Sequence, residues 1–338
     1  MNPLGIAVVG LGRIGKVHAE IIAMRLSNAR LVAVADVIES LARSTGEQFK
    51  VKWYTDYDKL LQDKEVDAVF ITTPTYLHKE MIVRAAEAGK HVFTEKPITV
   101  TRGEAVEAVR AARKAGVKLM VGYMRRFDDA YSEARRRIEQ GAIGRPLVFV
   151  NVARDPGPPP GWAQDPKLSG GIFLDMLSHD FDMARFLMSS EVRSVYVLGG
   201  AMLYEEIRQK GDLDVVTVNF EFESGAVGML HGSRKSVFGY DLRTEVMGTE
   251  GTVYVGSHHD PNLALGTKEG LTFKGVQWFW GRFYEAYVRE DQAFVDTVLG
   301  DGEPPVTGVD GLRVVEIAEA CWQSWREKRP VLVERTPV

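Results

Sequence analysis

Three glycines near the start of the chain constrain its fold more than any other feature. Gly10, Gly12 and Gly15 stand in G-x-G-x-x-G spacing, directly after the apolar run 6–9 and at the opening of a helical pattern over 14–26. In such a strand–turn–helix unit the first glycine allows a tight turn, the second lets a ligand approach the backbone, and the third lets helix and strand pack closely. The spacing and its flanks therefore predict an α/β domain with a parallel sheet rather than an isolated glycine turn.

Short β-rich runs alternate with helical patterns as far as residue 122. Several of the runs are apolar without alternation, as strands covered on both faces should be. The predicted strands cover residues 6–9, 31–35, 69–72, 91–94 and 119–122, and the predicted helices cover 14–26, 76–88 and 102–115. This rhythm is typical of βαβ units around a parallel sheet. We expect residues 1–122 to form a Rossmann-type, doubly wound domain.

The pattern changes after residue 122. Residues 192–255 carry mostly strand and turn signals with no clear helix between them, which favours an antiparallel or mixed sheet. Helices are predicted at 129–140, 171–188, 282–299 and 308–328, a strand at 147–153, and a proline-rich loop at 156–162. A chain of 338 residues also exceeds the usual size of a single core. We therefore expect residues 123–338 to form an α+β domain built on a large, mostly antiparallel open sheet.

The charges and the single cysteine exclude several classes of protein. With 42 basic and 46 acidic residues the net charge is -4, so no broad basic field is available for nucleic acid or anionic lipid. The apolar runs are too short to span a bilayer, and no secretory signal is recognisable at the start. Cys321 excludes an internal disulfide and a cysteine-based zinc site, and we interpret it as a core thiol. We expect a cytoplasmic protein that acts on a small molecule.

The glycine loop and Asp36 together predict a dinucleotide site. A helix that begins at such a loop directs free N–H groups and the positive end of its dipole at phosphate. Asp36 closes the second predicted strand, about 20 residues past the last glycine, where a carboxylate accepts hydrogen bonds from both ribose hydroxyls and repels a 2′-phosphate. NAD is therefore favoured over NADP. Arg43 in the following helix is a basic residue near this position, so NADP stays the alternative cofactor.

Lys96 follows a predicted strand in the segment Thr94-Glu95-Lys96-Pro97. The carboxyl edge of a parallel sheet is where such domains bind ligands, which distinguishes Lys96 from an ordinary surface lysine in a turn. An amine held at that edge can hydrogen-bond a reacting oxygen or move a proton.

A polar stripe is predicted on the otherwise apolar helix over 171–188. Asp175, His179 and Asp182 fall at i, i+4 and i+7, so they are expected one above another on a single helix face. Imidazole suits the removal of a hydroxyl proton at neutral pH, and a neighbouring carboxylate would orient the ring. The alternative is an aspartate–histidine pair on the helix surface with no catalytic role.

At these residues the chain resembles the glucose-fructose oxidoreductase / inositol dehydrogenase / MocA (Gfo/Idh/MocA) family, and within it the inositol 2-dehydrogenases. The resemblance covers nearly the whole length, and its motifs are specific in combination. They are the Gly10–Gly15 loop, Thr73-Pro74 with His78, Glu95-Lys96-Pro97, Gly122-Tyr123-Met124-Arg125-Arg126-Phe127-Asp128, Arg154-Asp155-Pro156 and the helix from Asp175 to His179.

The resemblance implies NAD-dependent oxidation of a secondary hydroxyl of a cyclic polyol or sugar, with hydride passing to C4 of the nicotinamide. Lys96, Asp175 and His179 look like the catalytic residues: His179 takes the hydroxyl proton, Asp175 supports it, and Lys96 hydrogen-bonds the oxygen. The implied cofactor residues are Gly10, Gly12, Arg13, Ile14, Gly15, Asp36, Thr72, Thr73, Pro74, His78, Glu95 and Lys96, and the implied pocket residues are Lys96, Met124, Arg125, Asp155, Asp175 and His179. No metal is implied. The family's open sheet usually pairs subunits, so a homo-oligomer, a dimer or a tetramer, is expected.

One departure from the family leaves the substrate open. Several inositol dehydrogenases have a histidine and an asparagine where this chain has Ala153 and Asp155, so the polyol and its stereochemistry are undetermined. The alternatives are a dehydrogenase of an aldose or anhydrosugar, an NAD-using glycosidase that works by transient oxidation, and a redox-inactive NAD-binding regulator. The last is disfavoured because the lysine, aspartate and histidine are all present.

The other conspicuous residues are interpreted as structural. His18 is expected to pack or cap in the first helix, His258-His259-Asp260 to form a solvated loop rather than a metal site, and Arg135-Arg136-Arg137 to lie on the solvated face of a helix. Aromatic residues between Trp278 and Tyr287 are expected in the core or a subunit interface, and Tyr284 among them is the candidate for substrate contact.

Overall fold

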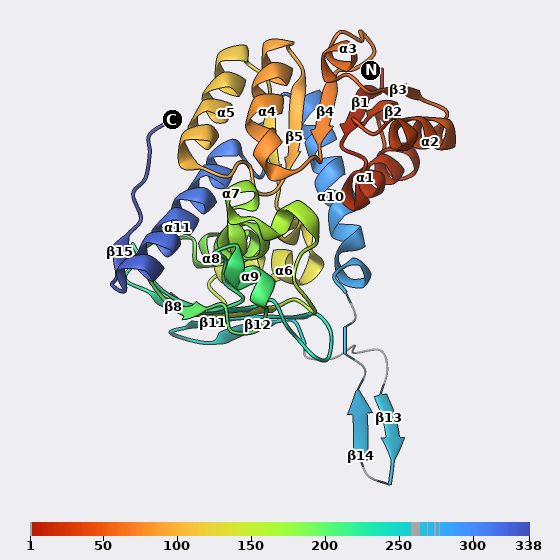
Figure 1. Ribbon diagram of the computed structural model, residues 1–338. Helices are drawn as coiled ribbons and strands as arrows, with labels where there is room; N and C mark the ends of the chain where they lie inside the picture. Colours follow the sequence, from red (N-terminus) through yellow and green to blue (C-terminus); the bar gives the residue numbers. More distant parts are fainter. Residues whose placement is uncertain (1, 258–263, 269, 274, 277) are drawn as a thin grey trace. The chain divides into compact units, whose positions relative to one another are not determined.

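The computed structural model describes residues 2–257, 264–268, 270–273, 275–276 and 278–338, and they form two compact units (Figure 1). Unit 1 comprises Met1–Met124, Glu285–Val315 and Thr336–Val338, and unit 2 comprises Arg125–Tyr284 and Glu316–Arg335. The domain boundary expected after residue 122 stays a prediction. The structure adds that Glu285–Val315, far along the chain, groups with the N-terminal part.

Unit 1 is built on a six-stranded sheet in which every neighbouring pair is parallel. The strands are β1 (Leu4–Val9), β2 (Ala29–Ala35), β3 (Lys52–Tyr54), β4 (Ala68–Ile71), β5 (His91–Glu95) and β6 (Leu119–Gly122). Their order is β3-β2-β1-β4-β5-β6, so the chain reverses its direction of progress between β1 and β4. The predicted doubly wound Rossmann sheet is confirmed, and ligands of such sheets bind at this reversal, outside the carboxyl ends of the strands.

Helices of unit 1 connect these strands and cover the sheet. They are α1 (Arg13–Met24), α2 (Glu39–Phe49), α3 (Tyr57–Leu61), the 3₁₀ turn η1 (Thr75–Leu77), α4 (His78–Glu87) and α5 (Arg102–Ala115), with parts of α10 (Trp280–Leu299) and α11 (Gly308–Glu327). Helix α5 begins at a capping box formed by Thr101 and Glu104. Phe294 of α10 packs edge-on against Phe70 and Phe93, which are fully buried in β4 and β5. These rings form the centre of the core of unit 1.

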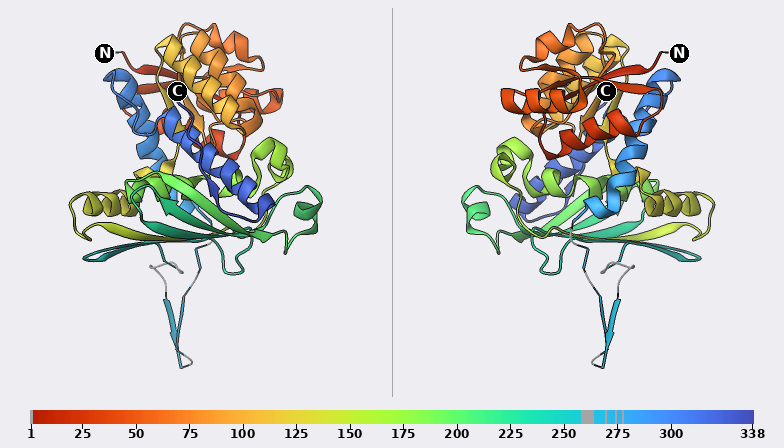
Figure 2. Two further views of the ribbon diagram at one scale, coloured as in Figure 1. Left: turned by 90° about the vertical axis from the view of Figure 1, so that its left-hand side faces the viewer. Right: turned by 90° about the vertical axis from the view of Figure 1, so that its right-hand side faces the viewer.

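Unit 2 is built on a seven-stranded sheet that is antiparallel except for one pair. Its strands are β7 (Pro146–Arg154), β8 (Val192–Gly200), β9 (Val215–Phe222), β10 (Val227–Ser233), β11 (Asp241–Gly248), β12 (Thr252–Val255) and β15 (Val331–Leu332), in the order β12-β11-β7-β10-β9-β8-β15. Only β7 and β10 run parallel. The predicted mostly antiparallel sheet is confirmed. Helices α6 (Asp129–Glu139) and α8 (Ser178–Met188) lie on one face of it (Figure 2).

Four short helical segments between residues 124 and 209 differ from the expectation. Helix α9 (Glu205–Gln209) lies between β8 and β9, where no helix was predicted. The 3₁₀ helix η3 (Gly161–Gln164) begins inside the proline-rich loop, and α7 (Pro166–Ser169) follows it, capped by Asp165. The 3₁₀ turn η2 (Met124–Phe127) precedes α6. Each is too short to give a clear helical period in the sequence.

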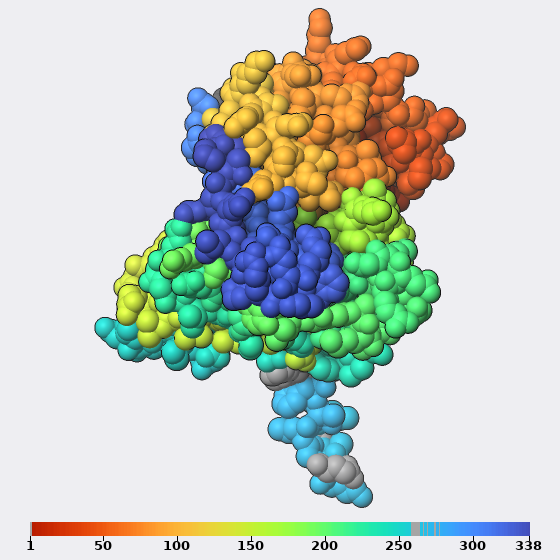
Figure 3. All heavy atoms as spheres, turned by 60° about the vertical axis from the view of Figure 1, so that its left-hand side comes forward, coloured from red at the N-terminus to blue at the C-terminus, as the bar shows by residue number. Residues whose placement is uncertain are grey.

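A separate hairpin joins β13 (Ala264–Thr267) to β14 (Gly270–Phe273). Its Leu265, Leu271 and Phe273 side chains are exposed, and Figure 3 draws the hairpin in light blue as a narrow strip of atoms. Among the described residues, no helix is both long and apolar enough to cross a membrane.

Candidate functional site

The glycine loop joins β1 to α1 at the carboxyl edge of the sheet of unit 1. Gly10 has φ +92°, and a Cβ there would lie 2.8 Å from the backbone nitrogen of Thr73. A Cβ at Gly15 would lie 1.9 Å from the carbonyl oxygen of Gly10, so a side chain at Gly15 would force α1 away from β1. At Gly12 a Cβ would meet nothing within 4 Å. The middle glycine therefore leaves space for a ligand at the start of α1.

The first turn of α1 is suited to an anion. Its N-cap residue is Gly12, which has no side chain to satisfy the first N–H groups, and the turn contains no acidic residue. Thr72, which directly follows β4, steadies the loop by donating a hydrogen bond from Oγ1 to the carbonyl oxygen of Gly10 at 2.6 Å. Free N–H groups and the helix dipole together favour phosphate at this position.

Asp36 lies beside the glycine loop, just beyond the end of β2. Its Oδ2 accepts a hydrogen bond from the backbone N–H of Leu11 at 2.7 Å, and its Oδ1 accepts one from Ile38 at 2.8 Å. Arg43 in α2 pairs with Glu47 through Nε at 2.8 Å. A carboxylate next to the phosphate-suited turn, with open space at Gly12, fits the ribose and pyrophosphate of NAD.

Lys96 stands in a tightly bonded turn that follows β5. Oε2 of Glu95 accepts a hydrogen bond from the backbone N–H of Lys96 at 3.0 Å, and the Lys96–Pro97 peptide is cis. His78 is buried and joins this turn to the end of β4, because its Nδ1 lies 2.8 Å from the carbonyl oxygen of Pro97 and its Nε2 lies 2.9 Å from that of Thr73. Burial lowers the pKa of His78, although both carbonyl contacts favour its protonated form. Pro74 is the N-cap of η1, directly after Thr73.

His18, expected to pack or cap in the first helix, is fully buried in α1 and packs against the rings of Phe70 and Phe93. It also bears charge. Its Nδ1 lies 2.9 Å from both carboxylate oxygens of Asp291, and its Nε2 lies 3.1 Å from Oε1 of Glu95. Burial by itself would lower the pKa of His18, but Asp291 and Glu95 outweigh it and raise the pKa to about 10. Packing is therefore only part of what this residue does.

The helix predicted over 171–188 is not one continuous α-helix. Ile172–Met176 forms a π turn closed by a hydrogen bond from Leu177 N to the carbonyl oxygen of Ile172, and α8 begins only at Ser178. A π turn takes more residues per turn than an α-helix, so the regular α-helical period assumed for Asp175 and His179 does not hold through this segment. The predicted continuous α-helix is therefore wrong, and the polar stripe through Asp175 and His179 stays a prediction.

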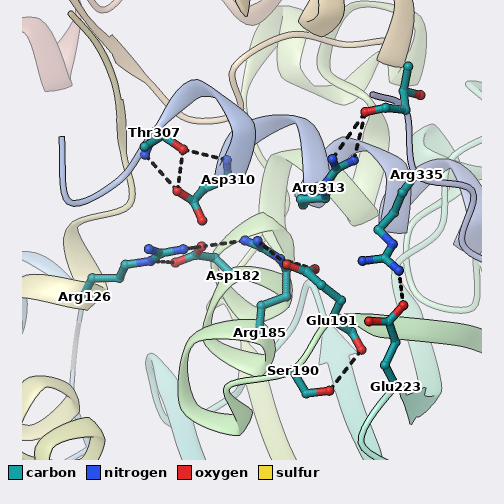
Figure 4. A network of polar contacts seen from close by, with 11 residues as sticks. Arg126, Asp182, Arg185, Ser190, Glu191, Glu223, Thr307, Asp310, Arg313 and Arg335 are labelled. Atoms are coloured by element: carbon teal, nitrogen blue, oxygen red, sulfur yellow. Dashed lines mark hydrogen bonds and ion pairs between the residues drawn. The ribbon is translucent and has the colours of Figure 1, made fainter. Parts of the chain in front are cut away.

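Asp182, the third member of that predicted stripe, has a separate role. Its side chain is fully buried and pairs with Arg126, with Nη2 2.6 Å from Oδ1 and Nε 2.9 Å from Oδ2. Arg185 lies within 3.8 Å of the same carboxylate and pairs in turn with Glu191, so four charged residues form one chain (Figure 4). This network joins the segment before α6 to α8.

Asp175 is held by Arg234, a residue that the sequence analysis did not single out. Nη1 of Arg234 lies 2.9 Å from Oδ2 of Asp175, and its Nη2 lies 3.0 Å from Oδ2 of Asp212. Oδ1 of Asp212 accepts a hydrogen bond from the backbone N–H of Ile172, the first residue of the π turn. Burial would lower the pKa of Arg234, but Asp175 and Asp212 outweigh it and raise that pKa. The guanidinium of Arg234 therefore binds both Asp175 and Asp212, and Asp212 is the carboxylate that accepts the hydrogen bond from the first residue of the π turn.

A second buried network in unit 2 surrounds Arg125. Its Nη1 lies 2.6 Å from Oδ1 of Asp180, and its Nη2 donates to the hydroxyl of Tyr240 at 3.1 Å. Oδ1 of Asp180 also accepts from Asn151 at 2.8 Å. Burial raises the pKa of Tyr240 to about 12, so its hydroxyl keeps its proton. Among the described residues, Nε of Arg125 has no hydrogen-bond partner.

The remaining predicted site residues lie as follows. Asp155 is half-buried, its backbone N–H donates to the carbonyl oxygen of Ser233, and its charge helps raise the pKa of Arg234. Met124 is buried at the end of unit 1, and Tyr284 is half-buried at the start of α10. Lys96 belongs to unit 1, whereas Asp175 and His179 belong to unit 2, so the predicted catalytic residues are divided between the units. His179 is buried near the start of α8.

Two expectations concern cysteine and metal. Cys321 is buried and reduced, and burial raises the pKa of its thiol. His258-His259-Asp260 lies outside the described residues, and within the described part of the chain no group of three or more His, Cys, Asp or Glu could hold a metal ion.

Several known proteins match this chain over nearly its whole length. Residues 4–123 match the model of an oxidoreductase family with an NAD-binding Rossmann fold, and residues 131–254 match the Gfo/Idh/MocA C-terminal domain. The chain is 39% identical to scyllo-inositol 2-dehydrogenase (NAD(+)) of Bacillus subtilis, over 97% of this chain and 96% of that protein. It is 38% identical to myo-inositol 2-dehydrogenase of Thermotoga maritima, over 97% and 98%. A crystal structure of scyllo-inositol dehydrogenase from Lactobacillus casei with bound NAD(H) and scyllo-inositol matches with a TM-score of 0.91 at 31% identity, covering 98% and 99% of the two chains.

Proposed function

The chain belongs to the Gfo/Idh/MocA oxidoreductase family, which confirms the resemblance in its sequence, and on that premise we propose that it oxidises a secondary hydroxyl of an inositol with NAD. It is an oxidoreductase with an NAD-binding Rossmann domain. The choice of substrate rests on one observation: over nearly its whole length the chain is 39% and 38% identical in sequence to two inositol 2-dehydrogenases.

The proposed chemistry divides one oxidation among three side chains. When bound, NAD supplies a nicotinamide ring that accepts the hydride leaving the carbinol carbon. His179 takes the proton of the substrate hydroxyl, so that the alcohol becomes a ketone. Lys96 donates a hydrogen bond to the same oxygen and stabilises the negative charge that develops there. Asp175 orients His179, and Arg234 in turn holds the carboxylate of Asp175.

The cofactor assignments extend the geometry of unit 1. We assign the pyrophosphate to the turn with Gly10, Gly12, Arg13, Ile14 and Gly15, and the adenosine ribose to Asp36. Residues Thr72, Thr73, Pro74, His78 and Glu95 are assigned to the wall of the nicotinamide site. Of these, His78 and Glu95 direct their polar atoms into the turn that carries Lys96.

Polyol recognition is assigned to a charged part of unit 2 and to Met124. Arg125, Asp155 and Tyr284 supply a guanidinium, a carboxylate and a phenol, and a polyol hydroxyl both donates and accepts hydrogen bonds. Asp155 and Ala153 replace the asparagine and histidine of several relatives. We therefore expect Asp155 to determine which inositol isomer the protein oxidises.

A substrate panel tests the proposed function. Several inositols, aldoses and anhydrosugars are each incubated with NAD or NADP, and the reduced cofactor is followed by absorbance. We expect turnover with at least one inositol and NAD. Absence of reduced cofactor across the panel would contradict the proposal, and release of free sugar from a glycoside without net reduction would favour the NAD-using glycosidase instead.

Cofactor choice gives a separate prediction. Asp36→Ala is expected to lower the ratio of kcat/KM with NAD to kcat/KM with NADP at least about tenfold, because two charge-assisted hydrogen bonds to ribose and the repulsion of a 2′-phosphate are lost. Asp36→Asn is the matched control, since its amide oxygen can still accept from Leu11 N. An unchanged ratio in both variants would remove Asp36 from cofactor selection.

We also propose that the chain forms a homo-oligomer through the outer face of the sheet of unit 2. Exposed apolar residues occupy successive strands there, and cross-strand pairing aligns them in rows. One row runs through Tyr254, Glu245, Val150, Met229, Asn219 and Tyr196. Apolar side chains gathered on several strands of one sheet face, here with Glu245 and Asn219 between them, are typical of an interface. We also propose a cytoplasmic location, because a dehydrogenase that releases NADH depends on the cell's pool of NAD and NADH.

Replacing one apolar residue on this face by a charge tests the oligomer. Met229 is 41% exposed, so Met229→Lys is expected to fold normally and to sediment as a smaller species than the unaltered chain. Met24→Lys on α1 is the matched control, because Met24 is an exposed methionine of unit 1. If Met229→Lys and the unaltered chain sediment alike, this face is not the interface.

A further inference from the structure

His18 connects the helix of the dinucleotide loop to the turn that carries Lys96. It lies one turn beyond Gly15 in α1, and its ring is fully buried between Glu95 at the end of β5 and Asp291 in α10. We propose that His18 is a positioning residue: as an imidazolium held by Asp291, it fixes the carboxylate of Glu95, which fixes the backbone of Lys96. This rests on the proposed function, in which Lys96 contacts the substrate oxygen.

Two ionised carboxylates around the ring favour a charged His18, although burial also raises the pKa of Asp291. Each ring nitrogen faces a carboxylate, with Asp291 2.9 Å from Nδ1 and Glu95 3.1 Å from Nε2. Carboxylates only accept hydrogen bonds, and a neutral imidazole can donate from one nitrogen but not from both. The other neighbours of the ring are Phe70, Phe93 and the edge of Tyr287. The raised pKa of His18, about 10, agrees with an imidazolium at neutral pH.

Glu95 transmits this constraint to Lys96 because its two oxygens serve different partners. Oε1 lies against His18, and Oε2 accepts the hydrogen bond from the backbone N–H of Lys96 at 3.0 Å. The carboxylate cannot rotate without breaking one of these contacts. A shift of about 1 Å in a reacting group can cost on the order of a hundredfold in rate.

Stability alone is a weak reason for such a cluster. Burying charges costs several kcal/mol of desolvation per ion, and apolar residues of similar volume often stabilise a core equally well. A charged, hydrogen-bonded pair, however, fixes the orientation of the side chains that form it, which an apolar contact does not. Here that constraint runs from α10 through α1, which begins at the dinucleotide loop, to the end of β5, which Lys96 directly follows.

Asp291→Asn tests the proposal without touching Glu95 or Lys96. The amide keeps the shape and can still accept from Nδ1, but it removes the charge that raises the pKa of His18. We expect kcat for inositol oxidation to fall about tenfold at pH 8, with the Kd for NADH changed less than about twofold. Lowering the pH to 6 is expected to restore part of the lost kcat relative to the unaltered enzyme, because His18 then regains its charge, and a charge-assisted hydrogen bond to Glu95 is roughly twice as strong as one from the neutral ring.

Hydrogen exchange provides a readout that does not depend on turnover. The backbone amide of Lys96, bonded to Glu95 in the unaltered protein, is expected to exchange faster in Asp291→Asn. Phe294→Leu is the matched control, because it trims the ring packed on Phe70 and Phe93 but leaves all three charges in place. It is expected to lower Tm without changing the pH profile or the exchange of the Lys96 amide.

The outcomes separate this inference from the proposed function. If the unaltered protein oxidises no inositol, the proposed function fails, and the role of His18 is then judged from hydrogen exchange alone. Slower or unchanged exchange of the Lys96 amide in Asp291→Asn would overturn that role. If the unaltered protein is active, a normal kcat and pH profile in Asp291→Asn overturns that role. An equal loss of kcat in Phe294→Leu would also overturn it, since the effect would then come from packing.

Discussion

Replacing Lys96 or His179 by alanine is expected to lower kcat for inositol oxidation at least about a hundredfold while NADH still binds. Lys96→Ala removes the donor that stabilises charge on the substrate oxygen, and His179→Ala removes the group that takes its proton. Neither substitution alters the glycine loop or Asp36, so the Kd for NADH, measured by its fluorescence, should stay within about threefold of the unaltered value.

Two observations would contradict these catalytic assignments. Turnover within about threefold of the unaltered enzyme in either variant would remove that residue from the mechanism. Lys79→Ala is the matched control, because Lys79 in α4 pairs with the exposed Glu107 at 3.5 Å, and pairs near the surface contribute little. If Lys79→Ala lost activity to the same extent as Lys96→Ala, the loss would reflect charge in general rather than the position of Lys96.

Replacing Arg234 by methionine is expected to have the second large effect, on both stability and rate. The side chains of Arg234 and Asp212 are 1% and 0% exposed, and removing one partner of such a buried pair costs about 3–5 kcal/mol. Asp175 loses its guanidinium at the same time, so kcat should fall at least about tenfold even where the variant remains folded. Thermal unfolding and steady-state kinetics below Tm measure the two effects.

Asp212→Asn separates the two roles of Arg234. The amide oxygen can still accept from Ile172 N, and the contact between Arg234 and Asp175 is untouched. We expect lower stability with kcat within about threefold of normal, whereas Arg234→Lys should keep the charge but lose the fork that reaches both carboxylates. If Arg234→Met turned over normally once folded, Arg234 would act on stability alone and would not position Asp175.

Most of unit 1 was predictable because its signals are local. The strands β1, β2, β4, β5 and β6 are short apolar runs, and α5 ends at the left-handed Gly116, so periodicity and a turn residue identified them. The strand β3 was not predicted, because it has three residues, is largely exposed and lies at the sheet edge. The five-residue helix α9 was missed for the same reason of length.

The sequence predicted candidate residues for the site but not the geometry that holds them. Asp175 and His179 stood out through their spacing, yet that spacing predicted a regular helix, and the π turn over Ile172–Met176 begins at a residue whose N–H donates a hydrogen bond to Asp212, which no local pattern reveals. Arg234 gave no signal in the sequence, since a single arginine at the end of a strand is ordinary. His18 did stand near the glycine loop, and its distance from Asp291 along the chain hid the pair.

By itself, the sequence determined that a dinucleotide-binding α/β domain begins the chain, and it predicted a lysine within that domain and an aspartate and a histidine beyond it as the groups for alcohol oxidation. Those conclusions depend on spacing over a few residues, where turn geometry and helical period act directly. Only the tertiary structure decided what holds these groups. Arg234 meets Asp175 across 59 residues, and His18 meets Asp291 across 273. Such pairs form because folding buries both charges together, and burial is a property of the whole core rather than of any one segment.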